Sequence, residues 1–251
     1  QSITTSGSNT CVGSGAGDAI TTGAENTILG SYCGTALTTG GNNVALGGFA
    51  LEKNTTASNN TSVGYHSLVA NTTGAGNTAV GSNALDANTT GQFNIALGRA
   101  ALGSTTTGSG NNAMGYASLF YNTTGYENTA IGHLAMEANT TGASNVAIGK
   151  GALDANTTAS KNSALGVNAL GANTTGNYNT AVGYLSLKSN TTGSNNSAFG
   201  DNAGEDITTG NNILCLGNRS GTSNSPSGSI TTASDAICLG DNSIGDLFCA
   251  D

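Results

Sequence analysis

Hydrophobic and polar positions recur along this chain with a period of 17 residues. Each unit opens on one residue followed by Thr-Thr, and an alternating segment such as Asn-Thr-Ala-Val-Gly at 77–81 comes next. Alternation with period two predicts a half-buried β-strand. We therefore divide the chain into fourteen coils, name each by its first residue, and number its positions as slots 0 to 16. The coils begin at residues 3, 20, 37, 54, 71, 88, 105, 122, 139, 156, 173, 190, 207 and 230.

Three slots keep one kind of residue from coil to coil. Slot 9 is apolar in all fourteen coils, from Val12 to Leu239, and slot 10 is Gly in all fourteen. Slot 14 is Leu or Met from Leu51 to Leu187 and Gly near either end of the repeat. The Gly at slot 10 predicts a corner with positive φ, because Gly adopts that conformation without steric cost. Slots 9 and 14 are predicted to supply the core.

These columns predict an all-β protein, a single β-solenoid (β-roll) of about fourteen 17-residue coils with two short strands in each coil. One coil cannot bury its apolar side chains alone, whereas stacked coils share a narrow continuous core. We expect one repeat domain over residues 1–251, with a loop insertion at about 218–229 and a short tail at 245–251.

Slot 6 is Asn in the first twelve coils. Identical Asn side chains stacked at strand spacing can hydrogen-bond to one another along the stack. We predict a structural ladder here and not a ligand site. The ladder residues are Asn9, Asn26, Asn43, Asn60, Asn77, Asn94, Asn111, Asn128, Asn145, Asn162, Asn179 and Asn196.

The small share of large apolar residues alone suggests disorder, whereas the disorder signature also needs high net charge and only 8% of these residues are charged. The repeat reverses that interpretation by gathering the apolar residues into columns. The six Lys and Arg are scattered and the net charge is -8, so we expect no nucleic-acid partner. No apolar run approaches the roughly 20 residues of a membrane helix, and we expect no membrane insertion.

The first residue, Gln1, suggests a mature product whose leader was removed. Five Cys in such a chain favour an oxidising compartment. We therefore expect an extracellular protein, secreted or associated with a surface.

The repeat places the cysteines: Cys11, Cys215 and Cys238 occupy slot 8, Cys33 occupies slot 13, and Cys249 lies in the tail. Coils 207 and 230 are neighbours, so Cys215 and Cys238 are expected one strand spacing apart, inside the Cα range of about 4.4–6.8 Å that a disulfide needs. We favour this pair within the chain. An odd cysteine count indicates intermolecular bonds, which makes Cys11, Cys33 and Cys249 candidates for inter-subunit pairing. Thiols that fill space as small apolar side chains are the alternative.

Eight coils open on Asn-Thr-Thr, which matches the Asn-x-Ser/Thr acceptor rule for glycosylation. Either a glycan column along one edge or a plain structural corner explains the repetition. The candidate acceptors are Asn54, Asn71, Asn88, Asn122, Asn139, Asn156, Asn173 and Asn190.

Catalytic chemistry needs clustered His, Cys, Asp or Glu. The two His residues, His66 and His133, stand four coils apart in different slots. The recurring acids at slot 15 mostly lack acidic neighbours, and the Gly-rich stretches have no phosphate-loop Lys. We expect no catalytic site, no metal site and no cofactor, and hence no enzyme.

The cores Asn77-Thr-Ala-Val-Gly81, Asn128-Thr-Ala-Ile-Gly132 and Asn145-Val-Ala-Ile-Gly149 resemble the head repeats of trimeric autotransporter (YadA-like) adhesins. Similar repeats occur in phage and giant-virus fibre proteins. The resemblance implies a β-roll, an adhesive or fibrous role, and a homotrimer. The 17-residue period is longer than the usual adhesin unit, and the chain shows neither a heptad stalk nor a membrane-anchor barrel.

Three functions follow from these features. The first is an extracellular structural protein that stacks head to tail into a surface or matrix filament, because neither end of the repeat carries a polar cap and open edges recruit further copies. The second is the receptor-binding or adhesive shaft of a phage fibre or trimeric adhesin, with Tyr65, Tyr116 and Tyr184 of slot 11 available for surface glycans. The third is an ice-binding solenoid, suggested by the Thr columns. Against it, adjacent strand residues face opposite sides and bulky residues interrupt nearby slots.

Overall fold

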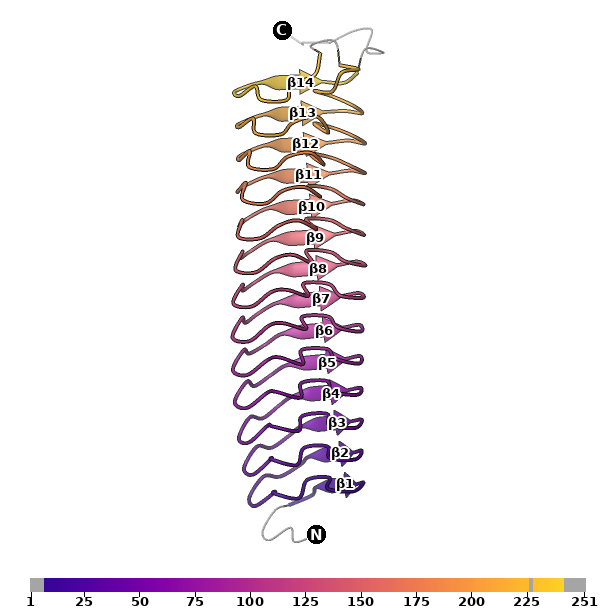
Figure 1. Cartoon of the computed structure of the whole chain (residues 1–251), viewed down its shortest axis with the longest axis vertical. Coiled ribbons are helices and arrows are strands. Elements are labelled where there is room, and N and C mark those ends of the chain that lie inside the picture. The colour runs from indigo at the N-terminus through magenta and orange to yellow at the C-terminus, as the bar shows by residue number, and fades with distance from the viewer. Residues whose placement is uncertain (1–6, 226–227, 242–251) are drawn as a thin grey trace, which may run out of the picture. The chain divides into compact units, whose positions relative to one another are not determined.

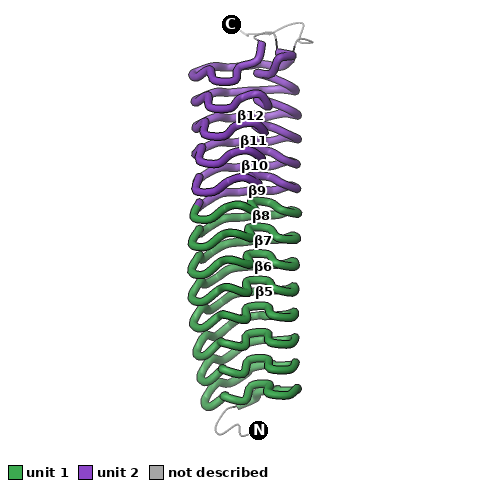
Figure 2. The backbone as a smooth tube through the Cα atoms, in the orientation of Figure 1, with its two compact units in different colours: residues 1–141 green, residues 142–251 purple. Residues whose placement is uncertain are grey.

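The computed structural model describes residues 7–225 and 228–241. The first residues of coil 3, Pro226, Cys249 and the tail at 245–251 lie outside the described residues. The protein is an all-β parallel solenoid, and it comprises two compact units, residues 1–141 and 142–251 (Figure 2).

Every coil contributes one three-residue strand, formed by slots 7 to 9. In unit 1 the strands lie one above another (Figure 1). They are β1 Thr10–Val12, β2 Thr27–Leu29, β3 Val44–Leu46, β4 Thr61–Val63, β5 Thr78–Val80, β6 Ile95–Leu97, β7 Asn112–Met114 and β8 Thr129–Ile131. Unit 2 contains β9 Val146–Ile148, β10 Ser163–Leu165, β11 Thr180–Val182, β12 Ser197–Phe199, β13 Leu214–Leu216 and β14 Ile237–Leu239.

Neighbouring strands within each unit pair in parallel and in strict register. Ala79 on β5 lies opposite Ala96 on β6, 17 residues later. Cys215 on β13 lies opposite Cys238 on β14 in spite of the inserted residues between them. Because the register never slips, each slot forms a column of side chains along the unit.

The prediction of two strands per coil is wrong: each described coil has only one. Slots 11 to 16 form consecutive turns, and the residues of slots 12 and 14 have positive φ, as at Asn83 (58°) and Leu85 (51°). Slot 5 has positive φ as well, as at Phe93 (57°). Strand residues need negative φ, so these left-handed residues replace the second strand with turns.

The interior is formed by slots 8, 13 and 14, not by slots 9 and 14 as predicted. Ala79, Ala84 and Leu85 of coil 71 are all fully buried, whereas Val80 at slot 9 is 39% exposed. Side chains alternate across a strand, so an inward slot 8 turns slots 7 and 9 outward. The facing small residues bring opposite walls of the coil together: the hydroxyls of Ser62 (slot 8) and Ser67 (slot 13) are in hydrogen-bond contact.

The Gly at slot 10 turns the corner with positive φ, as predicted. Gly81 has φ of 137°, and a Cβ placed there would lie 2.5 Å from the carbonyl oxygen of Gly98. That oxygen belongs to the backbone of the next coil and cannot move aside. Gly at this slot therefore allows both the corner and the close stacking of coils.

Backbone hydrogen bonds join successive coils well beyond the strands. In unit 1, Thr78 N donates to Asn94 O at 2.8 Å, Leu85 N donates to Ala101 O at 3.0 Å, and Gly98 N donates to Val80 O at 2.8 Å. The left-handed turns are thereby held by inter-coil bonds and by burial of Leu85. Among the residues that the structure describes, no helix is long and apolar enough to cross a membrane.

Candidate functional site

We define the strand face as the outward side chains of slots 7 and 9. No described slot 9 side chain is buried, and nine are more than a third exposed. These nine are Val12, Leu29, Val80, Met114, Ile131, Leu165, Phe199, Leu216 and Leu239. The column that the sequence assigned to the core is therefore an apolar ridge on the surface of each unit.

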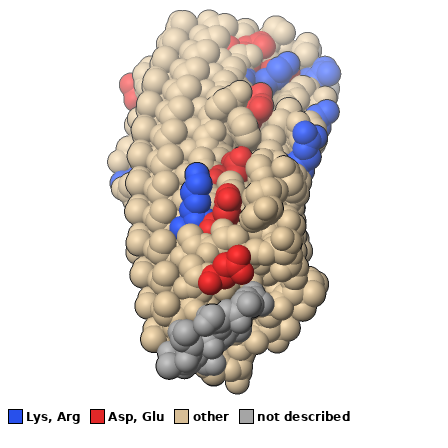
Figure 3. Space-filling view, turned by 60° about the horizontal axis from the view of Figure 1, so that its bottom comes forward, with Lys and Arg blue, Asp and Glu red and all other residues tan. Residues whose placement is uncertain are grey.

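The strand face is uncharged along its length. Slots 7 and 9 contain no Asp, Glu, Lys or Arg in any of the fourteen coils. The slots that flank the face are polar or charged in many coils, for example Glu127 and Lys161 at slot 5 and Arg99 and Lys150 at slot 11. On the face of the molecule in Figure 3, Lys, Arg, Asp and Glu side chains form separate groups among neutral side chains. An apolar centre with a polar rim is the usual arrangement of a protein interface.

The Asn residues of slot 6 form hydrogen-bonded ladders inside both units. In unit 1, Asn94 Nδ2 donates to Asn77 Oδ1 at 3.2 Å and to Gly108 O at 2.9 Å, and its backbone N donates to the same Oδ1 at 3.0 Å. The backbone bond to the preceding Asn Oδ1 recurs from Asn9 to Asn128 and again from Asn145 to Asn196. These Asn side chains satisfy buried backbone groups and one another, which is a structural role.

The eight Asn of the Asn-Thr-Thr corners are fully buried, which favours the structural corner over the glycan column. Asn71 Nδ2, the atom to which a glycan would attach, donates to Asn54 Oδ1 at 3.0 Å and to Gly74 O at 2.9 Å. A sugar has no room at that atom in the folded coil. The corner is therefore a second Asn ladder, at slot 0, and the acceptor motif is a by-product of its sequence.

This second ladder is interrupted where slot 0 is not Asn. Asn88 Oδ1 and Asn190 Oδ1 are buried and have no hydrogen-bond partner. In each case the next coil carries another residue at slot 0, Thr105 or Ile207, which lacks the amide that would donate to that oxygen. The two orphaned oxygens thus mark the ends of ladder segments.

The four described cysteines are free thiols that point into the solenoid. Cys215 and Cys238 are register partners on β13 and β14, and their thiols contact each other. Burial raises the pKa of Cys215 and of Cys33 to about 12. Cys33 has no exposed surface, so its predicted pairing with a second subunit is inconsistent with the folded coil.

The structure also brings Cys11 and Cys33 close enough for the charge of one thiolate to raise the pKa of the other thiol. Sequence reasoning missed this because the two residues stand in different slots, 8 and 13. Those slots face each other across the coil, as the contact between Ser62 and Ser67 shows. The shared preference of both slots for small residues was the available signal.

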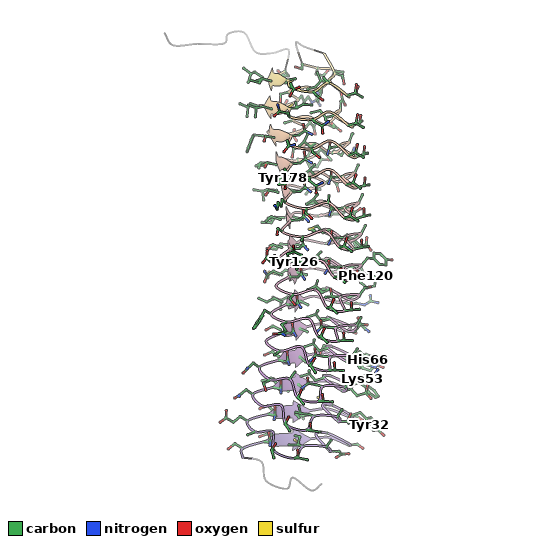
Figure 4. All side chains as sticks on the ribbon, turned by 90° about the vertical axis from the view of Figure 1, so that its left-hand side faces the viewer. Tyr32, Lys53, His66, Phe120, Tyr126 and Tyr178 are labelled. Carbon is green, nitrogen blue, oxygen red and sulfur yellow. The ribbon has the colours of Figure 1, made fainter. Side chains whose placement is uncertain are left out.

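Aromatic side chains gather on the slot 11 and 12 edge of unit 1. Tyr32 stacks on Phe49 with 5.5 Å between ring centroids, and Tyr65 stacks on His66 at 4.0 Å. Tyr32 and His66 lie on the same side of the unit (Figure 4). Tyr116 stacks on His133 at 5.3 Å. The rings largely contact one another, so each exposes part of one face.

The slot 15 edge of unit 2 contains a shallow hollow of about 470 Å³. It arises because Gly171 lies in this column between Asp154 and Lys188 and supplies no side chain. Asp154 Oδ1 is buried there without a hydrogen bond, and burial raises the pKa of the carboxyl. Lys188 Nζ pairs with Glu205 Oε1 at 3.7 Å. The described residues contain no group of three or more His, Cys, Asp or Glu placed to hold a metal ion.

The two Thr columns of slots 1 and 2 differ in their surroundings. Slot 1 hydroxyls donate to the backbone of the next coil, as Thr89 Oγ1 does to Thr106 O at 3.0 Å. The Thr at slot 2 is exposed in every described coil, from Thr22 to Thr232. These residues lie at a bend and not in a strand, so strand alternation does not apply to them.

Compared with known proteins, the chain matches no protein-family model and no curated protein.

Proposed function

We propose that this protein is an extracellular structural solenoid that assembles side by side with copies of itself through the strand face. The observation that carries the proposal is the uncharged strand face, with an apolar side chain at slot 9 of every coil. Exposed apolar surface that is continuous and rimmed by polar residues marks an interaction site.

The side chains of the strand face repeat at a regular spacing, which favours a second copy of the chain as the partner. Apolar side chains follow one another at the strand spacing of about 4.8 Å, and another solenoid of the same kind presents the same spacing. In unit 1 the eight slot 9 side chains, one in each coil, are apolar and none of them is buried. A stable interface needs a continuous surface of this kind and buries about 800 Å² on each partner.

Head-to-tail stacking is a further mode by which such subunits could extend into a filament. The bonds between successive coils are alike from one coil to the next, so a coil of another copy offers the same set of donors and acceptors. Unpaired strand edges recruit chains by this route. The two modes give different assemblies, because lateral pairing of two copies gives a closed dimer, whereas head-to-tail stacking adds copies without limit and gives an open filament.

Light scattering on the full chain tests lateral assembly. We expect the wild-type protein to have a molar mass that is a multiple of 24.4 kDa. The double variant Val80→Glu/Leu97→Glu buries charge in the face and should be monomeric. Thr73→Glu/Thr90→Glu adds the same charge to exposed positions of the same two coils and should leave the mass unchanged. A monomeric wild type, or equal dissociation of both variants, contradicts the proposal.

An adhesive shaft, as in the trimeric adhesins and viral fibres that the repeat resembles, is the second candidate. The aromatic edge of unit 1 supports it, because Tyr65 and Tyr116 are 53% and 45% exposed. Tyr65→Ala and Tyr116→Ala should each weaken retention on immobilised polysaccharide if the edge binds surface glycans. A molar mass of three chains in the same scattering experiment would favour the trimeric arrangement.

Ice binding is a third candidate, supported by the exposed Thr column of slot 2. The other exposed slots vary between coils, whereas slot 2 is Thr throughout. Thermal hysteresis that is present in the wild type and lost in Thr73→Tyr/Thr90→Tyr would establish this activity. Its absence in the wild type would remove the candidate.

A further inference from the structure

We propose that Cys215 and Cys238 are a site of disulfide formation, and that the bond latches coil 230 onto coil 207 across the inserted segment. The two residues are direct register partners on the parallel strands β13 and β14. Both occupy slot 8, so both side chains point into the solenoid. No other pair of the four described cysteines shares a slot on neighbouring strands.

The geometry requires little movement for the bond to form. Neighbouring strands lie about 4.8 Å apart, within the Cα separation of about 4.4–6.8 Å found across disulfides. The register places the thiols of Cys215 and Cys238 close enough to interact, and neither residue is more than 3% exposed.

The residue types at slot 8 make this pair distinctive. From Ala45 to Ala198 the slot holds Ala in every coil except one, where it holds Ser62. Ala is therefore sufficient to fill the position. Two consecutive Cys at β13 and β14 replace it next to the inserted segment at about 218–229.

Coil 230 is the part of unit 2 that such a bond would hold. Its residues from Thr231 to Asp235 are exposed. It is attached by backbone bonds such as Leu214 N to Ala236 O at 2.9 Å, and by Asn212 Nδ2 to Asp235 Oδ1 at 2.7 Å. The inserted segment separates coil 230 from coil 207 along the chain, so a covalent link between the coils closes a loop and removes freedom from the opened state.

The reaction is thiol–disulfide exchange with an external disulfide such as oxidised glutathione. The thiolate of Cys238 attacks that disulfide, forms a mixed disulfide and releases one external thiolate. Cys215 then loses its proton to water and attacks the Cys238 sulfur, which releases the second external thiolate. Two electrons pass to the external disulfide, which is reduced to two thiols.

Cys238 is 3% exposed, so its reaction with the external disulfide proceeds from molecules in which coil 230 has opened. The bond to Cys215 forms when the coil docks again, and burial, which raises the pKa of Cys215 to about 12, slows this step because the thiolate is scarce. Once formed, the bond is shielded in the interior. The latch is expected to close slowly in the folded protein and to resist reduction afterwards.

The test uses the full chain equilibrated in reduced and in oxidised glutathione, followed by alkylation under denaturing conditions and peptide mapping by mass spectrometry. We expect a Cys215–Cys238 cross-linked peptide only after oxidation. Hydrogen exchange of coil 230 amides should slow on the order of 100-fold when the bond is present.

Cys215→Ala is the matched variant, because Ala is the usual slot 8 residue, and it should fold yet lose the oxidation-dependent slowing. Cys33→Ala should retain it. Recovery of both Cys215 and Cys238 as alkylated thiols after oxidation overturns the proposal. A bond from either residue to Cys249 or to another chain does so as well.

Discussion

Two kinds of coil, which differ in the residue at slot 14, fill the same interior with different side chains. We call coils 37 to 173 leucine coils, because slot 14 is Leu or Met, and coils 3, 20, 190 and 207 glycine coils, because slot 14 is Gly. In leucine coil 71 the fully buried Leu85 supplies the large apolar side chain. Glycine coil 190 has no side chain at the equivalent Gly204.

In the glycine coils the missing volume comes from a neighbouring slot. A Cβ on Gly204 would lie 2.9 Å from Leu187 Cδ2 and 3.0 Å from Ile207 Cδ1. A Cβ on Gly17 in unit 1 would lie 2.9 Å from Ile20 Cδ1. Ile207 and Ile20 are the slot 0 residues of the coils that follow. The apolar side chain thus occupies one place in space and enters it from either of two positions in the chain.

The residue at slot 14 also decides which residue can occupy slot 0 of the next coil. After a leucine coil, slot 0 is free to be Asn and to join the buried ladder. After a glycine coil it must be apolar, as Ile207 is, and the ladder stops. Asn190 Oδ1 is left without a partner at that boundary. The residues at the two slots are therefore coupled. Leu at slot 14 allows Asn at slot 0 of the next coil, whereas Gly at slot 14 goes with Ile or Leu there.

The largest expected effect is loss of the large apolar side chain from either coil type. Leu102→Ala in a leucine coil and Ile207→Ala in a glycine coil each empty a fully buried position. Each should lower the free energy of unfolding by about 2–5 kcal/mol in chemical denaturation.

Thr73→Ala, at an exposed slot of a leucine coil, is the control and should change stability by less than about 0.5 kcal/mol. A nearly neutral Ile207→Ala would show that glycine coils do not depend on slot 0 as leucine coils depend on slot 14.

Repairing the interrupted ladder should have a smaller effect and the opposite sign. Thr105 is buried among Asn residues and leaves Asn88 Oδ1 without a donor. Thr105→Asn supplies the amide and should raise the free energy of unfolding by about 1 kcal/mol.

Asn139→Thr is the reciprocal change in the same column and should destabilise the protein by removing the bond from Asn139 Nδ2 to Asn122 Oδ1 at 2.8 Å. If both substitutions lower stability, the slot 0 ladder does not contribute as described.

The smallest expected effect concerns Asp154 at the hollow of unit 2. Burial raises the pKa of this carboxyl above its ordinary value of 3.8, so ionisation is less favourable in the folded protein. Asp154→Asn should raise the free energy of unfolding at neutral pH by less than about 1 kcal/mol, because solvent still screens the site.

The direction of the pKa shift of Asp154 determines how the free energy of unfolding depends on pH. The stabilisation that comes from the raised pKa is present below 3.8 and is lost as pH rises through the folded pKa. The difference between wild type and Asp154→Asn should therefore shrink on acidification through that range. Glu137→Gln, at slot 15 of a leucine coil, is the control. A difference that grows on acidification would contradict the assignment.

The sequence was sufficient to predict the fold class, the period, the slot 10 corner and the burial of slot 14. Each rests on a residue type repeated in nearly every coil. The strand face was misplaced because alternation fixes which slots share a side but not which side is inward. Slot 9 carries the larger apolar residues, so it was assigned to the core. The small residues of slot 8, such as Ala79, are inward because opposite walls of the coil meet there.

A second strand was predicted although none forms, and the burial of the corner Asn residues was not foreseen, for a different reason. Leu85 has φ of 51°, a conformation that bulky residues rarely adopt. It is tolerated because burial and the inter-coil backbone bond hold it in place. The burial of Asn71 likewise follows from stacking on Asn54, a tertiary contact that a surface acceptor motif does not reveal.

A double-mutant cycle on Gly204 and Ile207 tests directly whether slot 14 of one coil and slot 0 of the next are coupled. Gly204→Leu alone collides with Ile207 and Leu187, and Ile207→Asn alone buries an amide beside an emptied site. Each should lower the free energy of unfolding by about 1–3 kcal/mol. Together they recreate the leucine-coil arrangement, with a donor for Asn190 Oδ1. We expect the double variant to lose less stability than the sum of the two single losses, by at least about 1 kcal/mol. Additive losses would contradict the coupling.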